Sequence, residues 1–324
     1  SGFAADDADV NIPVPAEALE RRFATEPFSI VAAEISRPKA KGDITLKAEV
    51  SFSGNPPYRV KLRRADPGAE TFNNRPRYDL ASYELQKLFL EPAEYVVPPT
   101  ALRTLPVADL LPYAPEARPT FRGSDEVLVV LQYWLQEVKV VADAYDPALF
   151  GSDPGYARHV GQLNVLTYLI EHGDANLGNF LASRAEQSPR VFSVDNGVAF
   201  AHNESDRSDV WKYLRVPGLP ADTVSRLQAL TQDELQERLG VLAQWRLDGG
   251  RWIAEPPGDN LAPQRGVRQK DGVVQLGLTK SEIAQVDRRR MQLLRQVVQV
   301  AAGKAGLQPA LSGKVARLLY RGSE

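Results

Sequence analysis

The stretch VFSVDNGVAF, residues 191–200, decides how the rest of the sequence is interpreted. It opens with the apolar character of a short buried strand, but Asp195, Asn196 and Gly197 interrupt that character. Because Asn-Gly favours the positive φ angles of a tight turn, a simple hairpin is one interpretation. The other is that the strand delivers the Asp195 carboxylate to a functional site, and the upstream sequence bears on this choice.

The stretch HGDANLGNFL, residues 172–181, supplies two further polar groups. Asp174 follows the end of an apolar helix predicted over 154–173, and Asn179 comes five residues later. The segments FLAS and RVFSVD have the pattern of a hairpin that would return Asp195 to Asp174 and Asn179. A carboxylate just past a helix C-terminus opposes the helix dipole, which indicates a functional reason for Asp174. Taken together, the three groups favour a metal-ligand role for Asp195 over a plain turn.

These groups suit phosphoryl transfer, which requires a group that orients the attacking hydroxyl and oxygen ligands that hold Mg²⁺. The two motifs also resemble those of the protein kinase-like superfamily, in which an Asp-x-x-x-x-Asn catalytic loop precedes an Asp-x-Gly metal loop. They are most similar to its atypical branch, which includes the type II phosphatidylinositol 4-kinases and the secretory-pathway kinases related to Golgi casein kinase. The resemblance covers roughly residues 28–213. It implies ATP and Mg²⁺ or Mn²⁺, with Asp174 as the catalytic acid–base residue and Asn179 and Asp195 as metal ligands.

The upstream half supplies candidates for the rest of a nucleotide site. In the resemblance, a lysine on the third strand contacts the ATP phosphates and is paired with a glutamate on the following helix. The loop RPKAKGD, residues 37–43, takes the place of the glycine-rich nucleotide loop, and VLQYWLQ, residues 130–136, takes the place of the hinge that cradles adenine. The residues assigned to nucleotide binding on this basis are Lys61, Glu84, Lys41, Gly42 and Tyr133.

The order of the predicted elements indicates an α+β protein with a two-lobed, protein kinase-like fold, in which an antiparallel β N-lobe with one helix precedes a mostly helical C-lobe. Alternating patterns predict strands, and apolar spacings of three and four residues predict helices. The predicted strands cover 28–36, 44–52, 58–65, 95–105 and 126–135, and the predicted helices cover 80–92, 154–173, 219–245 and 280–304. The predicted organisation is an N-terminal arm over 1–27, an N-lobe over 28–135 and a C-lobe over 136–324, with an inserted loop or hairpin over about 246–277.

Composition excludes several classes of function. The chain has 324 residues and a net charge of −2, so no general attraction to nucleic acid is expected. It has no cysteine, which excludes disulfides, thiolate metal sites and cysteine nucleophiles. No apolar run approaches the ~20 residues that span a bilayer. The polar, proline-containing start slightly favours an exported protein and leaves a cytoplasmic one open. The oligomeric state also stays open.

The expected function is that of an ATP-dependent kinase that transfers the γ-phosphate to a hydroxyl, with a protein or glycan acceptor slightly favoured. The nucleotide loop has a single glycine, so a non-catalytic pseudokinase that binds nucleotide or a partner stays an alternative. An enzyme of the same fold that transfers AMP is another. A metal hydrolase that uses Asp174 and Asp195 ranks last, because it gives Lys61 and Glu84 no role.

Overall fold

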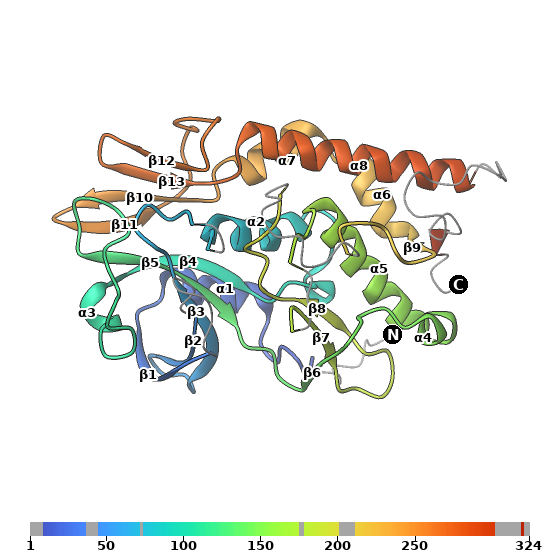
Figure 1. The fold of residues 1–324 in the computed structure, drawn as a ribbon, viewed down its shortest axis with the longest axis horizontal. Coiled ribbons are helices and arrows are strands. Elements are labelled where there is room, and N and C mark those ends of the chain that lie inside the picture. Colours follow the sequence, from blue (N-terminus) through green and yellow to red (C-terminus); the bar gives the residue numbers. More distant parts are fainter. Residues whose placement is uncertain are drawn as a thin grey trace, which may run out of the picture.

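The computed structural model describes residues 9–36, 45–71, 74–174, 178–200, 211–301 and 319–320. A five-stranded antiparallel sheet with the order β1-β2-β3-β5-β4 forms one half, and the longer helices form most of the other (Figure 1). The elements of the first half are α1 (Ala16–Thr25), β1 (Phe28–Ile35), β2 (Thr45–Phe52), β3 (Tyr58–Arg64), α2 (Pro76–Gln86), the 3₁₀ helix η1 (Pro92–Glu94), β4 (Thr100–Pro106), α3 (Val107–Leu110) and β5 (Glu126–Tyr133). The predicted strands of the N-lobe are therefore confirmed, although β4 begins later than expected.

The two faces of this sheet have different roles. On one face, Val60 and Leu62 of β3 pack with the fully buried Leu19 and Phe23 of α1 in a single apolar cluster. Residues 1–27 were predicted to be an arm, but α1 contributes to this core because its apolar residues recur at helical spacing. The other face carries polar side chains in β3, and the alternation of side chains along a strand places Lys61 there.

Helix α2 covers the second face and differs from the helix predicted over 80–92. It begins at Pro76, since proline is well tolerated in the first turn of a helix, and it ends at Gln86. Almost every residue of α2 is buried, including Asp79, Ser82 and Gln86. Apolar periodicity does not mark the start of such a helix, because its polar residues are also enclosed by protein.

The helical half begins with a three-stranded sheet and the long helix α5. Its elements are β6 (Val138–Val140), α4 (Pro147–Ser152), α5 (Pro154–Leu169), β7 (Phe180–Ser183), β8 (Val191–Ser193), β9 (Leu219–Pro220), α6 (Ala221–Ala229), α7 (Gln232–Gly240), α8 (Lys280–Ala301) and β14 (Leu319–Tyr320). The single helix predicted over 219–245 is wrong. Thr231 starts a new helix with a capping box, in which its hydroxyl accepts from the backbone N–H of Glu234 while the Glu234 carboxylate accepts from the Thr231 N–H.

The segment predicted to be an inserted loop or hairpin over 246–277 is instead a four-stranded antiparallel sheet. Its strands are β10 (Ala243–Asp248), β11 (Arg251–Glu255), β12 (Val267–Lys270) and β13 (Val273–Leu276), in the order β11-β10-β13-β12. Trp252 is buried where this sheet meets β5, and its backbone N–H donates to the Glu126 carboxylate at 2.5 Å. The inserted sheet therefore lies against the five-stranded sheet, and α8 leads away from it along the helical half (Figure 1).

No helix in the described part of the chain is long and apolar enough to cross a membrane. We keep 135/136 as the proposed boundary between the lobes, since β5 is the last strand of the five-stranded sheet and ends at Tyr133.

Candidate functional site

The predicted hairpin between the two motifs is confirmed. Strands β7 and β8 pair antiparallel, with Phe180 opposite Ser193 and Ala182 opposite Val191. Just beyond this pairing, the Val194 N–H donates to the Asn179 carbonyl at 2.9 Å. The Gly173 N–H also donates to the Val198 carbonyl at 3.0 Å. The loop that carries Asp174 and Asn179 is thus hydrogen-bonded to the segment that carries Asp195.

Asp195 does not lie in a hairpin turn, because no strand follows it in residues 194–200. Its φ of +63° is in the left-handed region, which costs a non-glycine residue free energy and is concentrated at functional sites. The fully buried Asn196 supports this backbone, since its Oδ1 accepts from the Ser193 hydroxyl at 2.7 Å. The Asp195 side chain is 22% exposed and faces two cations. The turn interpretation is therefore wrong, and the strand does present a carboxylate.

Both cations facing Asp195 come from strand β3. Lys61 Nζ lies 3.2 Å from Asp195 Oδ1, and Arg63 Nη1 donates to the same oxygen at 2.9 Å. Residues 61 and 63 share a face of β3 because side chains alternate along a strand. The structure thus brings the predicted third-strand lysine against the predicted metal ligand, and it adds an arginine that the sequence analysis did not single out.

Arg63 also links the strand to helix α2. Its Nη2 forms an ion pair with Asp79 Oδ2, and the two side chains are each 1% exposed. Arg63 therefore joins two carboxylates, one on α2 and one on the metal loop. Gly197 is required beside it, because a Cβ there would lie 2.9 Å from Arg63 Nη2. The alternation in YRVKLRRA, which places residues 61 and 63 on the same face, was the available signal for Arg63.

The predicted pairing of Lys61 with Glu84 is not what the structure has. Among the described residues, Glu84 forms ion pairs with Lys87 at 2.6 Å and with Arg238 at 2.8 Å. The carboxylate of α2 that pairs with a cation of β3 is Asp79, and that cation is Arg63. Positions 79 and 84 are five residues apart, which separates them by about 140° around a helix with 3.6 residues per turn. Glu84 therefore cannot share the face on which Asp79 lies.

Tyr133 also points away from the cations. It lies opposite Val60 in the pairing of β3 with β5, and it belongs to the apolar cluster on the α1 face. Its hydroxyl accepts from Gln136 at 2.8 Å, and burial raises its pKa. The neighbouring residue Gln132, and not Tyr133, lies opposite Lys61 in this pairing. The other two predicted nucleotide contacts, Lys41 and Gly42, lie outside the described residues.

Asp174 and Asn179 are held by each other and by the preceding histidine. Asn179 Nδ2 donates to the Asp174 carbonyl at 2.5 Å, and the Asp174 N–H donates to His172 Nδ1 at 3.3 Å. Burial lowers the pKa of His172 to about 4, against a smaller opposing effect of the Asp195 charge. A neutral His172 is consistent with Nδ1 as an acceptor. His172 therefore supports the loop, and its ring packs on Phe180 at 5.7 Å.

The residues present fit a divalent cation with oxygen ligands. Asn179 uses its amide nitrogen within the loop, which leaves its side-chain oxygen for a cation. Asp195 adds a partly exposed carboxylate. In the described residues, no group of three or more His, Cys, Asp or Glu side chains could hold a metal by itself. This donor set suits Mg²⁺ or Mn²⁺ on a nucleotide, because such ions take one or two protein carboxylates together with phosphate oxygens.

Comparisons with known proteins agree with this architecture. No family model matches the sequence, and no curated protein matches it. A crystal structure of the Golgi casein kinase matches with a TM-score of 0.51 and 12% identity, over 91% of this chain and 76% of that chain. A crystal structure of the Golgi casein kinase with Mn and ADP bound matches with a TM-score of 0.53 and 12% identity, over 94% of this chain and 78% of that chain. This chain therefore has a two-lobed, kinase-like fold that is similar to the fold of the Golgi casein kinase.

Proposed function

We propose that this protein is an ATP-dependent phosphotransferase that moves the γ-phosphate to a hydroxyl acceptor. The observation that carries the proposal is the 3.2 Å contact between Lys61 of β3 and Asp195 beyond β8. Two residues far apart in sequence, each assigned from a different motif, meet at one point between the lobes. The Golgi casein kinase, a solved structure of which holds Mn and ADP, supports the same assignment.

Each residue has a definite role in this proposal. Asp174 orients the acceptor hydroxyl and accepts its proton. Asn179 and Asp195 would hold Mg²⁺ or Mn²⁺, which would neutralise the charge of the phosphates. Lys61 would contact the phosphates of ATP, and Arg63 pairs with Asp79 of α2. The chain thus supplies positioning and charge, which account for most of the catalysis in phosphoryl transfer.

The acceptor and the compartment are proposed from the name of the matched protein. A protein or glycan hydroxyl stays the favoured acceptor, because the matched protein is called a casein kinase and casein is a protein. An exported location is likewise proposed, since the Golgi is part of the secretory pathway. A hydroxyl acceptor of either kind requires the same base and the same metal ligands.

The decisive experiment follows the protein by intact mass after incubation with ATP and Mn²⁺, with and without acceptor mixtures. Added phosphate on the protein or on an acceptor is the expected result. Added AMP would indicate the alternative of AMP transfer. Nucleotide binding without any transfer would indicate a pseudokinase. Absence of both binding and transfer would overturn the proposal.

A variant of Asp174 tests the role of the base. Asp174→Asn keeps the size of the side chain but cannot accept a proton, so kcat should fall by several orders of magnitude while nucleotide affinity stays within about twofold. The matched control is Asp222→Asn, because Asp222 pairs with Arg158 on the surface and does not contact the site. Wild-type turnover in Asp174→Asn would exclude it as the base. Loss of nucleotide binding would make it a metal ligand instead.

A further inference from the structure

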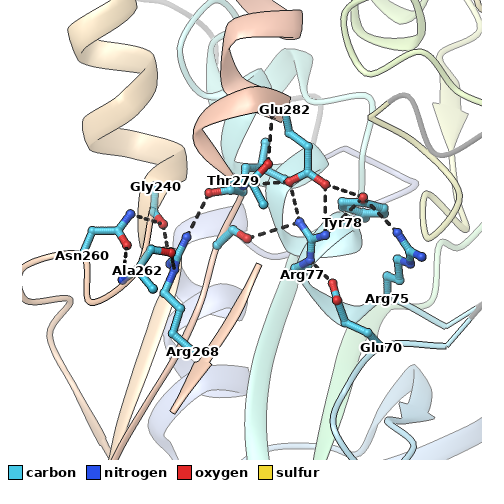
Figure 2. Close-up of polar contacts among 12 residues, drawn as sticks. Glu70, Arg75, Arg77, Tyr78, Gly240, Asn260, Ala262, Arg268, Thr279 and Glu282 are labelled. Carbon is cyan, nitrogen blue, oxygen red and sulfur yellow. Dashed lines mark hydrogen bonds and ion pairs between the residues drawn. The ribbon is translucent and has the colours of Figure 1, made fainter. Parts of the chain in front are cut away.

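Glu282 of helix α8 contacts helix α2, and both oxygens of its carboxylate accept hydrogen bonds (Figure 2). It first forms a capping box with Thr279, in which Oε2 accepts from the Thr279 N–H at 2.7 Å and the Thr279 hydroxyl accepts from the Glu282 N–H at 3.1 Å. The same carboxylate then accepts both terminal nitrogens of Arg77, at 2.6 and 3.0 Å. It also accepts the Tyr78 hydroxyl at 2.5 Å. A helix cap requires only the first of these contacts.

Arg77 is enclosed by the inserted sheet and its connections. Its side chain is 4% exposed, and Nη1 also donates to the Gly277 carbonyl at 3.3 Å. A Cβ on Gly266 would lie 2.2 Å from Arg77 Nε, so that glycine is what makes room for the guanidinium. Arg77 has a second ion pair with Glu70, and its guanidinium lies 4.3 Å from the centre of the Tyr78 ring (Figure 2). A buried arginine in this setting needs its carboxylate, because an unpaired buried charge strongly destabilises the folded state.

The first turn of α2 is held by these contacts and not by a cap of its own. Arg75, at the N-cap position, makes no side-chain capping bond. Two residues of this turn are linked to the candidate metal loop, Asp79 through an ion pair and Tyr78 through a ring contact. Asp79 pairs with Arg63, which donates to Asp195 at 2.9 Å. The Tyr78 ring lies 5.2 Å from the ring of Phe200, at the end of the metal loop.

We propose that Glu282, acting through Arg77 and Tyr78, is a positioning residue for the candidate metal loop. The inserted sheet and the first turn of α8 hold the start of α2 at the place where Asp79 can keep Arg63 against Asp195. The position of α2 is thereby set by a distant part of the same chain. This inference rests on the proposed function, since it concerns how the metal ligand of that site is held.

The test compares Mn²⁺-dependent nucleotide binding in three proteins. The affinity for ADP is measured by calorimetry with and without Mn²⁺ for the wild type, Glu282→Gln and Asp287→Asn. Asp287 is the matched control, because it forms a partly buried ion pair with Arg290 at 2.7 Å on the same helix, and its side-chain hydrogen bonds among the described residues go to Arg290 and not to α2. Glu282→Gln should lower the affinity for ADP with Mn²⁺ at least tenfold and change the affinity without metal by less than twofold. Asp287→Asn should change neither, even if it lowers the melting temperature equally.

A double-mutant cycle tests whether Glu282 acts through Arg77. Arg77→Met should have the same effect as Glu282→Gln, and the double variant should be no worse than the more affected single variant. If Glu282→Gln does not fold, Arg77→Lys provides the test, since it keeps the charge but loses the two-pronged contact. Equal effects of Glu282→Gln and Asp287→Asn, or equal losses with and without Mn²⁺, would overturn the positioning role alone. A wild type that binds ADP no better with Mn²⁺ than without it would overturn the proposed function and this inference together.

Discussion

The two ends of helix α2 are both held by ion pairs, but the surroundings of those pairs differ. At the N-terminal end, Arg63 and Asp79 are each 1% exposed. At the C-terminal end, Glu84 meets Arg238, whose side chain is 42% exposed, and Lys87, which also pairs with Glu20. Water screens the pair with Arg238, and Lys87 keeps Glu20 if Glu84 is lost, whereas removal of either Arg63 or Asp79 leaves the other charge buried without this partner. The ion pair at the end of α2 that faces the candidate site is therefore the one whose loss should destabilise the fold more.

The largest expected effect comes from the carboxylate that Arg63 and Lys61 share. Asp195→Asn should abolish the metal-dependent increase in melting temperature that ATP or ADP produces with Mn²⁺, because the amide is a much weaker ligand for a divalent cation. Thermal shift assays with and without Mn²⁺ measure this directly. Glu84→Gln, at the other end of α2, should keep the wild-type shift. A normal shift in Asp195→Asn would show that Asp195 is not a metal ligand.

The next effect compares the stability of the two ends. Asp79→Asn should lower the free energy of unfolding by about 3–5 kcal/mol, because it leaves Arg63 buried without a full counter-charge. Glu84→Gln should lower it by less than about 1 kcal/mol, since Arg238 is partly exposed and Lys87 keeps its ion pair with Glu20. Urea unfolding at neutral pH provides both values. Equal losses of unfolding free energy in the two variants would show that the two ends of α2 contribute equally to stability.

The pH dependence of stability tests the buried contacts of α2 a second time, at Glu282. Burial opposes its ionisation, but the hydrogen bond and charge of Arg77 and the Tyr78 hydroxyl outweigh burial and lower its pKa below the ordinary value of 4.5. The folded state therefore releases this proton more readily than the unfolded state, so the pair stabilises the protein above pH 4.5 and that contribution is lost as the pH falls through the lower folded value. Unfolding in urea between about pH 5 and pH 3 should show a shallower loss for Glu282→Gln than for the wild type. If the free energy of unfolding falls equally with pH in the two proteins, Glu282 does not contribute to the loss of stability in acid.

The smallest expected effect is a coupling close to zero. A double-mutant cycle on Lys61 and Glu84, with nucleotide affinity as the measured quantity, should be additive within about 0.5 kcal/mol, because Glu84 contacts Lys87 and Arg238. The same cycle on Arg63 and Asp79 should give a coupling of about 1–3 kcal/mol. Strong coupling between Lys61 and Glu84 would restore the pairing that the sequence first suggested.

The sequence by itself determined the elements that depend on local pattern. Alternating apolar residues marked β2 and β3, apolar runs marked β1 and β5, and two short apolar segments marked the hairpin of β7 and β8. That hairpin was enough to predict that the loop with Asp174 and Asn179 lies beside Asp195. Alternation also placed Lys61 on one face of β3, although it placed Arg63 there equally.

Only the tertiary structure decided which partners those side chains have. Asp79 and Glu84 lie on the same helix, and the sequence offers no reason to prefer the first, because the choice depends on which face of α2 the sheet encloses. The inserted sheet was missed for a similar reason. Its glycine- and proline-rich connections obscure short strands whose Trp252 is buried by contact with β5. Buried polar partners are selected by desolvation between segments far apart in the chain, and no local period in a sequence records that selection.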